Sequence, residues 1–231
     1  MSTVAWFLVP LVFGGAAGYL LNRIALIYLS RYISPVGEYG GFVGLLLHGG
    51  DTKRLFSGDM IVVEAAASFL TAAAVAVHGV SSELLFILPI VYLIILLSFI
   101  DSRIRILPNQ INLAGIVIGV GYAFVREGFT PDDALLGILA GGGFSAATAF
   151  LYQAIRAHEG LGLGDVKLLA FFGSFAGWDG VLLIIMAGSL MGAIWGMYAA
   201  LSAQQEDVMR HEIPFGPFLG LAALGYLFVV I

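Results

Sequence analysis

The chain has 231 residues, of which 60% are hydrophobic and only 11% are charged, and its formal net charge is −5. Charged residues make up roughly a quarter of a soluble domain, so this composition excludes an ordinary soluble protein and favours one that folds in a bilayer. The chain contains no cysteine, which excludes disulfide bonds, thiolate metal sites and a cysteine nucleophile.

Apolar runs near the length of roughly 20 residues that crosses a bilayer follow one another along the chain. They lie at 4–29, 60–78, 84–100, 111–125, 134–155, 166–178, 180–202 and 213–231. The sequence therefore predicts an all-α protein, a polytopic membrane bundle of about eight transmembrane helices. The runs at 111–125 and 166–178 are short, so about six or seven spans also agree with the pattern.

Three glycines in the first run, Gly14, Gly15 and Gly18, indicate close helix packing, because small residues let membrane helices approach each other. The polar stretch at 31–59 also contains apolar residues and is predicted to be a loop on the membrane surface.

The orientation follows from the basic residues, because short cytoplasmic loops carry an excess of lysine and arginine. In the predicted topology, most basic residues fall in loops on one side of the membrane: Arg31, Lys53, Arg54, Arg103, Arg105, Arg156, Lys167 and Arg210. In the loops on the opposite side, the one basic residue is Arg126. The pattern predicts that the side with most basic residues faces the cytoplasm and that both termini lie outside it.

Two acidic residues stand at the ends of spans, where ionisable groups often mark function. Asp101 ends the third run, and Asp165 opens the sixth. Taken singly, Asp101 is typical of an interfacial carboxylate beside an arginine, and Asp165 is typical of a helix N-cap. The predicted topology places both at the cytoplasmic ends of their spans, where they can meet at one depth.

Two facing carboxylates can cut a peptide bond. They share a proton, since like charges at close range cannot both ionise readily. The ionised aspartate takes a proton from the attacking water, while the protonated one polarises the carbonyl and later supplies the leaving amine. Gly162 and Gly164 would admit an extended substrate close to the backbone, or would simply form a flexible loop. No metal is predicted, because the histidines lack metal-ligand spacing.

Three motifs resemble those of the bacterial type IV prepilin peptidases, a family of GxGD membrane aspartyl proteases. They are Asp101 followed by Ile106-Leu107-Pro108-Asn109, the string from Glu159 to Ala170 around Gly162-Leu163-Gly164-Asp165, and the closing segment Ile213-Pro214-Phe215-Gly216-Pro217. The resemblance implies a catalytic pair, Asp101 and Asp165, and an endopeptidase that removes the short basic leader of prepilins or pseudopilins. It also implies a bacterial inner membrane location with the site facing the cytoplasm, no peptidase cofactor, and no nucleic acid partner.

The resemblance divides the chain into a two-span N-terminal region at 1–82 and a peptidase core at 83–231. Supporting roles are expected for Gly162, Gly164 and Lys167, although a snorkelling lysine at the lipid interface explains Lys167 equally well. Substrate-binding or structural roles are expected for Glu64, Asn109, Pro214, Gly216 and Pro217.

Glu64 resembles a glutamate of family members that also methylate the new amino terminus with S-adenosylmethionine. Those proteins usually carry a cysteine-rich loop between the first two spans, which this chain lacks. S-adenosylmethionine is therefore expected only if methyl transfer is retained, and a structural hydrogen bond between helices is the alternative role for Glu64. Two other classes remain open: a proton-coupled transporter, whose carboxylates should lie at mid-membrane, and a noncatalytic membrane scaffold.

Overall fold

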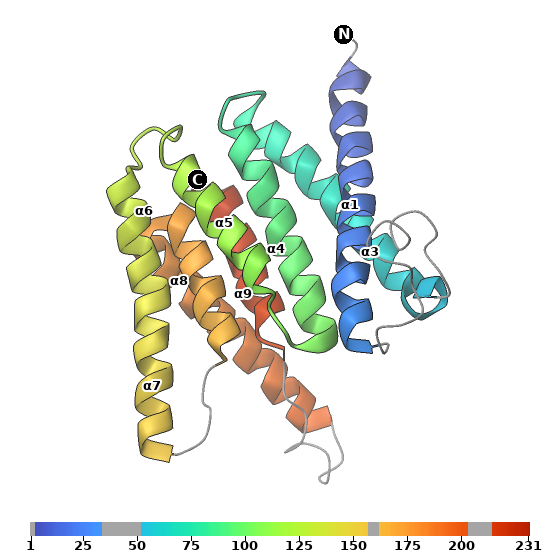
Figure 1. The fold of residues 1–231 in the computed structure, drawn as a ribbon. Coiled ribbons are helices and arrows are strands. Elements are labelled where there is room, and N and C mark those ends of the chain that lie inside the picture. Colours follow the sequence, from blue (N-terminus) through green and yellow to red (C-terminus); the bar gives the residue numbers. More distant parts are fainter. Residues whose placement is uncertain (1–2, 34–51, 157–161, 203–213) are drawn as a thin grey trace. The chain divides into compact units, whose positions relative to one another are not determined.

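The computed structural model describes residues 3–33, 52–156, 162–202 and 214–231, and these residues form helices and no strand (Figure 1). Five helices of this described part are long and apolar enough to cross a membrane. They lie at Leu8–Tyr28, Met60–His78, Leu84–Ile104, Pro131–Leu151 and Leu163–Ala199. The all-α membrane architecture is confirmed, whereas the expected count of eight spans is not.

The chain forms two compact units, Met1–Ile104 and Arg105–Ile231, which we call unit 1 and unit 2. This boundary follows packing, whereas the division at residue 82 follows the sequence motifs and stays a prediction.

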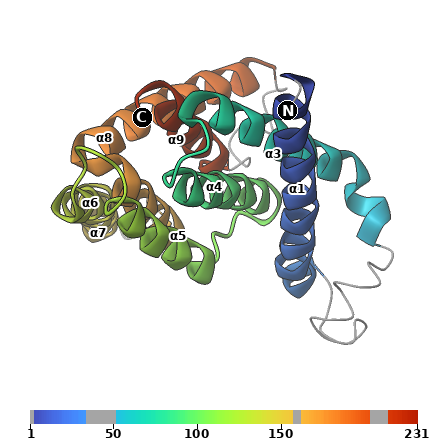
Figure 2. The same ribbon diagram turned by 90° about the horizontal axis from the view of Figure 1, so that it is seen from above.

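Unit 1 contains α1 (Thr3–Ile33), α3 (Thr52–His78) and α4 (Leu84–Ile104). Helices α1 and α3 lie against each other (Figure 2), and glycines set their spacing. A β-carbon on Gly14 would lie 2.6 Å from the Ala67 carbonyl oxygen, and one on Gly18 would lie 2.6 Å from the Glu64 Cα. The predicted packing role of these glycines is confirmed.

Part of the expected surface loop at 31–59 is helical. Helix α1 continues to Ile33 and α3 already begins at Thr52, while 34–51 lie outside the described residues. Helix α4 joins α3 through a 2.8 Å hydrogen bond between the Thr71 and Tyr92 hydroxyl groups.

Unit 2 begins with α5 (Asn109–Tyr122), which starts directly after Pro108. A capping box then opens α6 (Pro131–Ile138), since the Thr130 hydroxyl accepts from the Asp133 backbone N–H and the Asp133 carboxylate accepts from the Thr130 N–H. The chain continues through a π-helical turn, η1 (Leu139–Gly143), into α7 (Phe144–Arg156), so α6, η1 and α7 form one long rod (Figure 1).

Helix α8 (Leu163–Ser202) contains a sharp break at Gly177, whose φ of 77° and ψ of −176° lie outside the helical region. The spans expected at 166–178 and 180–202 divide this segment at residue 179, two residues later than the break in the structure. Two carbonyl groups beside the break receive side-chain donors: Arg126 Nη1 lies 3.3 Å from the Phe175 oxygen, and the Tyr226 hydroxyl lies 3.2 Å from the Ala176 oxygen. These donors replace helix hydrogen bonds that the break removes.

The last helix, α9 (Gly216–Val229), packs against α8. Helices α5 and α9 have 14 residues each, or about 21 Å at the α-helical rise per residue. Both are shorter than the spans expected at 111–125 and 213–231.

Candidate active site

Asp101 lies in the last turn of α4, and its side chain is only 6% exposed. The neighbouring Ser102 is exposed, and its hydroxyl donates to the Phe99 carbonyl at 2.7 Å. An ordinary interfacial carboxylate would be solvated, whereas a buried carboxylate needs a charged or hydrogen-bonding partner. Its burial therefore makes Asp101 a stronger candidate for a functional group than its sequence position alone does.

Asp165 is the third residue of α8, and its backbone N–H donates to the Gly162 carbonyl at 3.0 Å. Its carboxylate turns back toward that glycine, because a β-carbon on Gly162 would lie 3.7 Å from Asp165 Oδ2. Gly162 is exposed and Asp165 is half-buried. The carboxylate therefore lies beside a stretch of backbone that carries no side chain, as the approach of an extended peptide requires.

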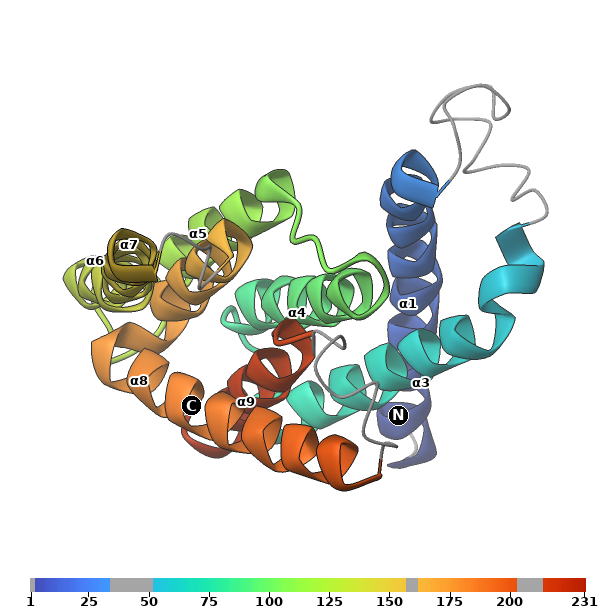
Figure 3. The same ribbon diagram turned by 90° about the horizontal axis from the view of Figure 1, so that it is seen from below.

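The start of α8 packs against the start of α5 in unit 2 (Figure 3). A β-carbon on Gly164 would lie 3.2 Å from Leu107 Cβ, so a larger residue at 164 would press on Leu107. Lys167 Nζ donates to Asn109 Oδ1 at 2.7 Å. The structure thus brings together three predicted residues, Gly164, Lys167 and Asn109, and adds Leu107.

One turn further along α5, the Asn112 side chain is 1% exposed, and neither its amide nitrogen nor its oxygen has a hydrogen-bond partner among the described residues. A buried carboxamide without partners is destabilising, typically by about 1–3 kcal/mol. Asn112 therefore lowers the stability of the fold, and packing alone does not explain its presence.

Glu64 lies half-buried in α3, where it meets Asn22 of α1. The Asn22 side-chain amide donates to Glu64 Oε1 at 3.1 Å and to the Met60 carbonyl at 2.9 Å. The structure thus contains the interhelical hydrogen bond that the sequence analysis proposed as the alternative role of Glu64. Sequence reasoning missed Asn22, although it lies one helical turn from Gly18 on the same face of α1.

The closing motif lies at the start of α9, where Pro214 and Pro217 are half-buried and Gly216 is buried. A β-carbon on Gly192 would lie 3.5 Å from the Phe215 ring. The motif thus packs against the second half of α8, beyond the break, and this contact supports a structural role.

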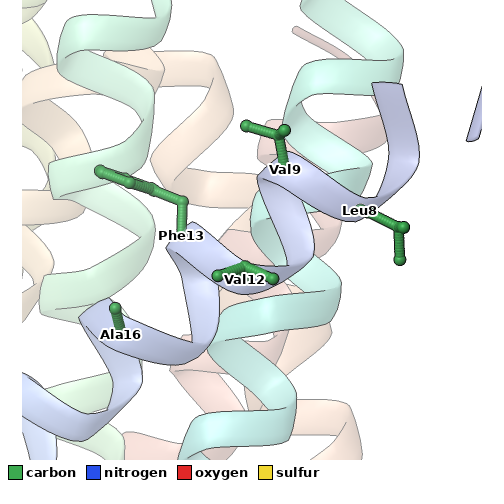
Figure 4. Close-up of a pocket in the computed structure, with 5 residues that line it drawn as sticks. All are labelled: Leu8, Val9, Val12, Phe13 and Ala16. Carbon is green, nitrogen blue, oxygen red and sulfur yellow. The ribbon is translucent and has the colours of Figure 1, made fainter. Parts of the chain in front are cut away.

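A wholly apolar hollow lies on α1, lined by Leu8, Val9, Val12, Phe13 and Ala16 (Figure 4). It carries no group that could perform chemistry, and its surface suits lipid chains. Among the described residues, no three side chains of the metal-binding types gather in one place.

The two aspartates belong to different compact units, Asp101 to unit 1 and Asp165 to unit 2. Their meeting in one site stays a prediction from the sequence, and cleavage and cross-linking experiments can test it.

Residues 86–197 match the model of the type IV leader peptidase family, and this range includes both aspartates. The chain is similar to proteins named prepilin leader peptidase/N-methyltransferase. The one from Pseudomonas putida is 32% identical over 74% of this chain and 58% of its own length. The one from Xanthomonas campestris pv. campestris is 31% identical over 78% of this chain and 63% of its own length.

The chain therefore spans less than two thirds of the length of these relatives. No solved structure matches it. Together with the five apolar helices, these similarities identify a multi-pass membrane protein.

Proposed function

We propose that the chain is a membrane aspartyl endopeptidase that removes the short basic leader from type IV prepilins or pseudopilins, because residues 86–197 match the model of the type IV leader peptidase family. The observation that carries the proposal is that the matched range holds two aspartates at helix ends, one buried at the end of α4 and one in the first turn of α8.

In the proposed mechanism, Asp101 and Asp165 share one proton in a joint site. The ionised carboxylate removes a proton from a water molecule, which attacks the scissile carbonyl carbon. The protonated carboxylate donates a hydrogen bond to the carbonyl oxygen and then transfers a proton to the leaving nitrogen. The backbone beside Gly162 offers room for the extended peptide.

The protein would lie in the bacterial inner membrane with this site facing the cytoplasm, as the distribution of basic residues predicts. The substrates would carry their leader on that side, where the basic residues of the leader stay outside the hydrocarbon. The peptidase reaction needs no cofactor in this proposal. S-adenosylmethionine would bind only if the chain also methylates the product.

The test is cleavage of a purified prepilin by the protein in liposomes, with Asp101→Asn and Asp165→Asn compared with wild type. Asparagine keeps the size of the side chain and cannot exchange the proton, so each variant should lose at least about a hundredfold in rate. Asp132→Asn, at an exposed aspartate in the first turn of α6, is the matched control and should cut normally. Normal cutting by either catalytic-site variant would exclude the proposed pair and restore the transporter hypothesis.

A further inference from the structure

The hydrogen bond between Lys167 and Asn109 joins the beginnings of two helices that are 58 residues apart in the chain. Lys167 is the fifth residue of α8, and Asn109 is the first residue of α5. Asn109 follows Asp101 by eight residues, and Lys167 follows Asp165 by two. The bond therefore connects the two segments that carry the proposed catalytic motifs.

Glycine contacts fix how α5 and α8 lie along each other. At the start, Gly164 faces Leu107; further along, a β-carbon on Gly115 would lie 2.6 Å from the Phe171 ring. The residue numbers rise together in both helices, so α5 and α8 run parallel. The bond between Asn109 and Lys167 lies between these two contacts and adds a polar link to an apolar seam.

The positive charge of Lys167 does not stabilise α8. A cation near the N-terminal end of a helix opposes the helix dipole, at a cost that falls off within the first turn. Its partner is a neutral amide oxygen, so no ion pair offsets that effect at this contact. A specific hydrogen bond to α5 accounts for the position of Lys167 better than helix stabilisation does.

Lys167 and Asp165 both lie near the start of α8. The two residues are two positions apart, about 200° around a helix of 3.6 residues per turn, so their side chains leave on nearly opposite faces. A bond that holds the Lys167 face to α5 fixes the rotation of the first turn of α8, and therefore the direction in which Asp165 points.

We propose that Asn109 and Lys167 are a positioning pair that fixes the rotation and depth of the Asp165 turn against the segment that follows Asp101. The inference rests on the proposed peptidase function and names two residues that support it without touching the reacting atoms. In this proposal the hydrogen bond, and not the positive charge at 167, holds the Asp165 turn in position.

The first experiment measures prepilin cleavage in liposomes for Asn109→Ala, Lys167→Met, the double variant, and the exchanged variant Asn109→Lys with Lys167→Asn. Each single variant should lower kcat by about tenfold to a hundredfold with little change in KM, because small misplacements of catalytic groups have effects of that size. The double variant should be no slower than the slower single one.

The exchanged variant should recover most of the lost kcat, because it rebuilds the same hydrogen bond with donor and acceptor reversed. Gln110→Ala, at the exposed neighbour of Asn109, is the control and should cut at the wild-type rate. Single variants with wild-type kcat would overturn the proposal. Slow single variants that the exchange does not restore would also overturn it, because the charge at 167 would then be what matters.

A second experiment does not depend on activity. The chain has no cysteine, so the pair Leu107→Cys and Gly164→Cys can be introduced without removing native thiols. Because Leu107 Cβ lies 3.2 Å from the position of a β-carbon at 164, oxidation should cross-link this pair readily. Adding Lys167→Met should slow the cross-link.

If the wild-type protein cuts no prepilin, the proposed function fails while the cross-link still decides the positioning role. An unchanged cross-linking rate with Lys167→Met would refute that role. The two failures are therefore distinguishable.

Discussion

Gly137 of α6 and Gly173 of α8 touch backbone to backbone, such that a β-carbon on either residue would collide with the carbonyl oxygen of the other. Two helices in a membrane gain stability from such close approach, because van der Waals packing replaces the hydrophobic driving force that lipid does not provide. Because the contact is reciprocal and involves backbone on both sides, this crossing should tolerate a single added methyl group poorly.

We therefore expect Gly137→Ala to destabilise the protein by about 3 kcal/mol, at the upper end of the usual cost of overpacking. The same change at Gly225, an exposed glycine inside α9 whose β-carbon would meet nothing within 4 Å, should be neutral or slightly stabilising. Thermal unfolding of the purified variants in detergent measures both. Equal effects of the two substitutions would contradict the described packing of α6 on α8.

Arg105 directly follows α4 and has a φ of 54°, in the left-handed region that non-glycine residues rarely adopt. Arg105→Gly should therefore be more stable than Arg105→Ala, by about 1–2 kcal/mol, since both lose the side chain and only alanine keeps the β-carbon strain. At Arg103, inside the helix, the order should reverse, because glycine costs up to about 1 kcal/mol relative to alanine there. The four variants are compared by thermal unfolding, and the same order at both sites would refute the left-handed geometry.

The hydrogen bond from Asn22 to Glu64 allows a structural role of Glu64 to be tested separately from a catalytic one. Glu64→Gln keeps an acceptor for Asn22, so leader cleavage and stability should stay near wild type. Glu64→Leu removes the acceptor and should cost about 0.6–1.7 kcal/mol, the range for such bonds in membranes.

Methyl transfer can be followed in the same variants with labelled S-adenosylmethionine and cleaved substrate. If the wild type methylates and Glu64→Gln cuts normally without methylating, Glu64 has a chemical role beyond its hydrogen bond. If wild type does not methylate, its role is the structural one.

Tyr226 donates its hydroxyl to the Ala176 carbonyl beside the break in α8. Tyr226→Phe should cost about 0.5–1.5 kcal/mol, the usual net contribution of one hydrogen bond. The matched change Tyr198→Phe, at an exposed tyrosine of the same unit, should have little effect. Unfolding measurements in detergent compare the two, and equal losses would show that the break does not depend on Tyr226.

Much of the architecture could be predicted, because hydropathy marks membrane helices directly. The runs at 60–78 and 84–100 agree closely with the spans Met60–His78 and Leu84–Ile104. The break in α8 was placed two residues too late because Gly177 and Gly180 stand on either side of Trp178-Asp179, and local sequence does not say which glycine adopts a positive φ. The donors that stabilise the break, Arg126 and Tyr226, come from distant parts of the chain.

The individual residues of the candidate site could be predicted from the sequence, but the contacts between them could not. Asn109 and Lys167 were both identified, yet a separation of 58 residues gives no sign that they are bonded. Leu107 was quoted only as part of a motif, and its contact with Gly164 became visible in the packing. The pairing of Asp101 with Asp165 stays a prediction.

The short helices α5 and α9 have a consequence for the surrounding lipid. Each has exposed apolar side chains, Leu113 and Val117 on α5 and Leu221 on α9, so acyl chains reach them. At about 21 Å, these helices fall short of a hydrocarbon layer that is about 30 Å thick. Lipid that adapts to their length must thin around them, and the cost of thinning grows with acyl chain length. Reconstitution into phosphatidylcholines of increasing chain length should therefore lower the thermal stability of the protein step by step, which makes bilayer thickness a determinant of where in a membrane this fold is most stable.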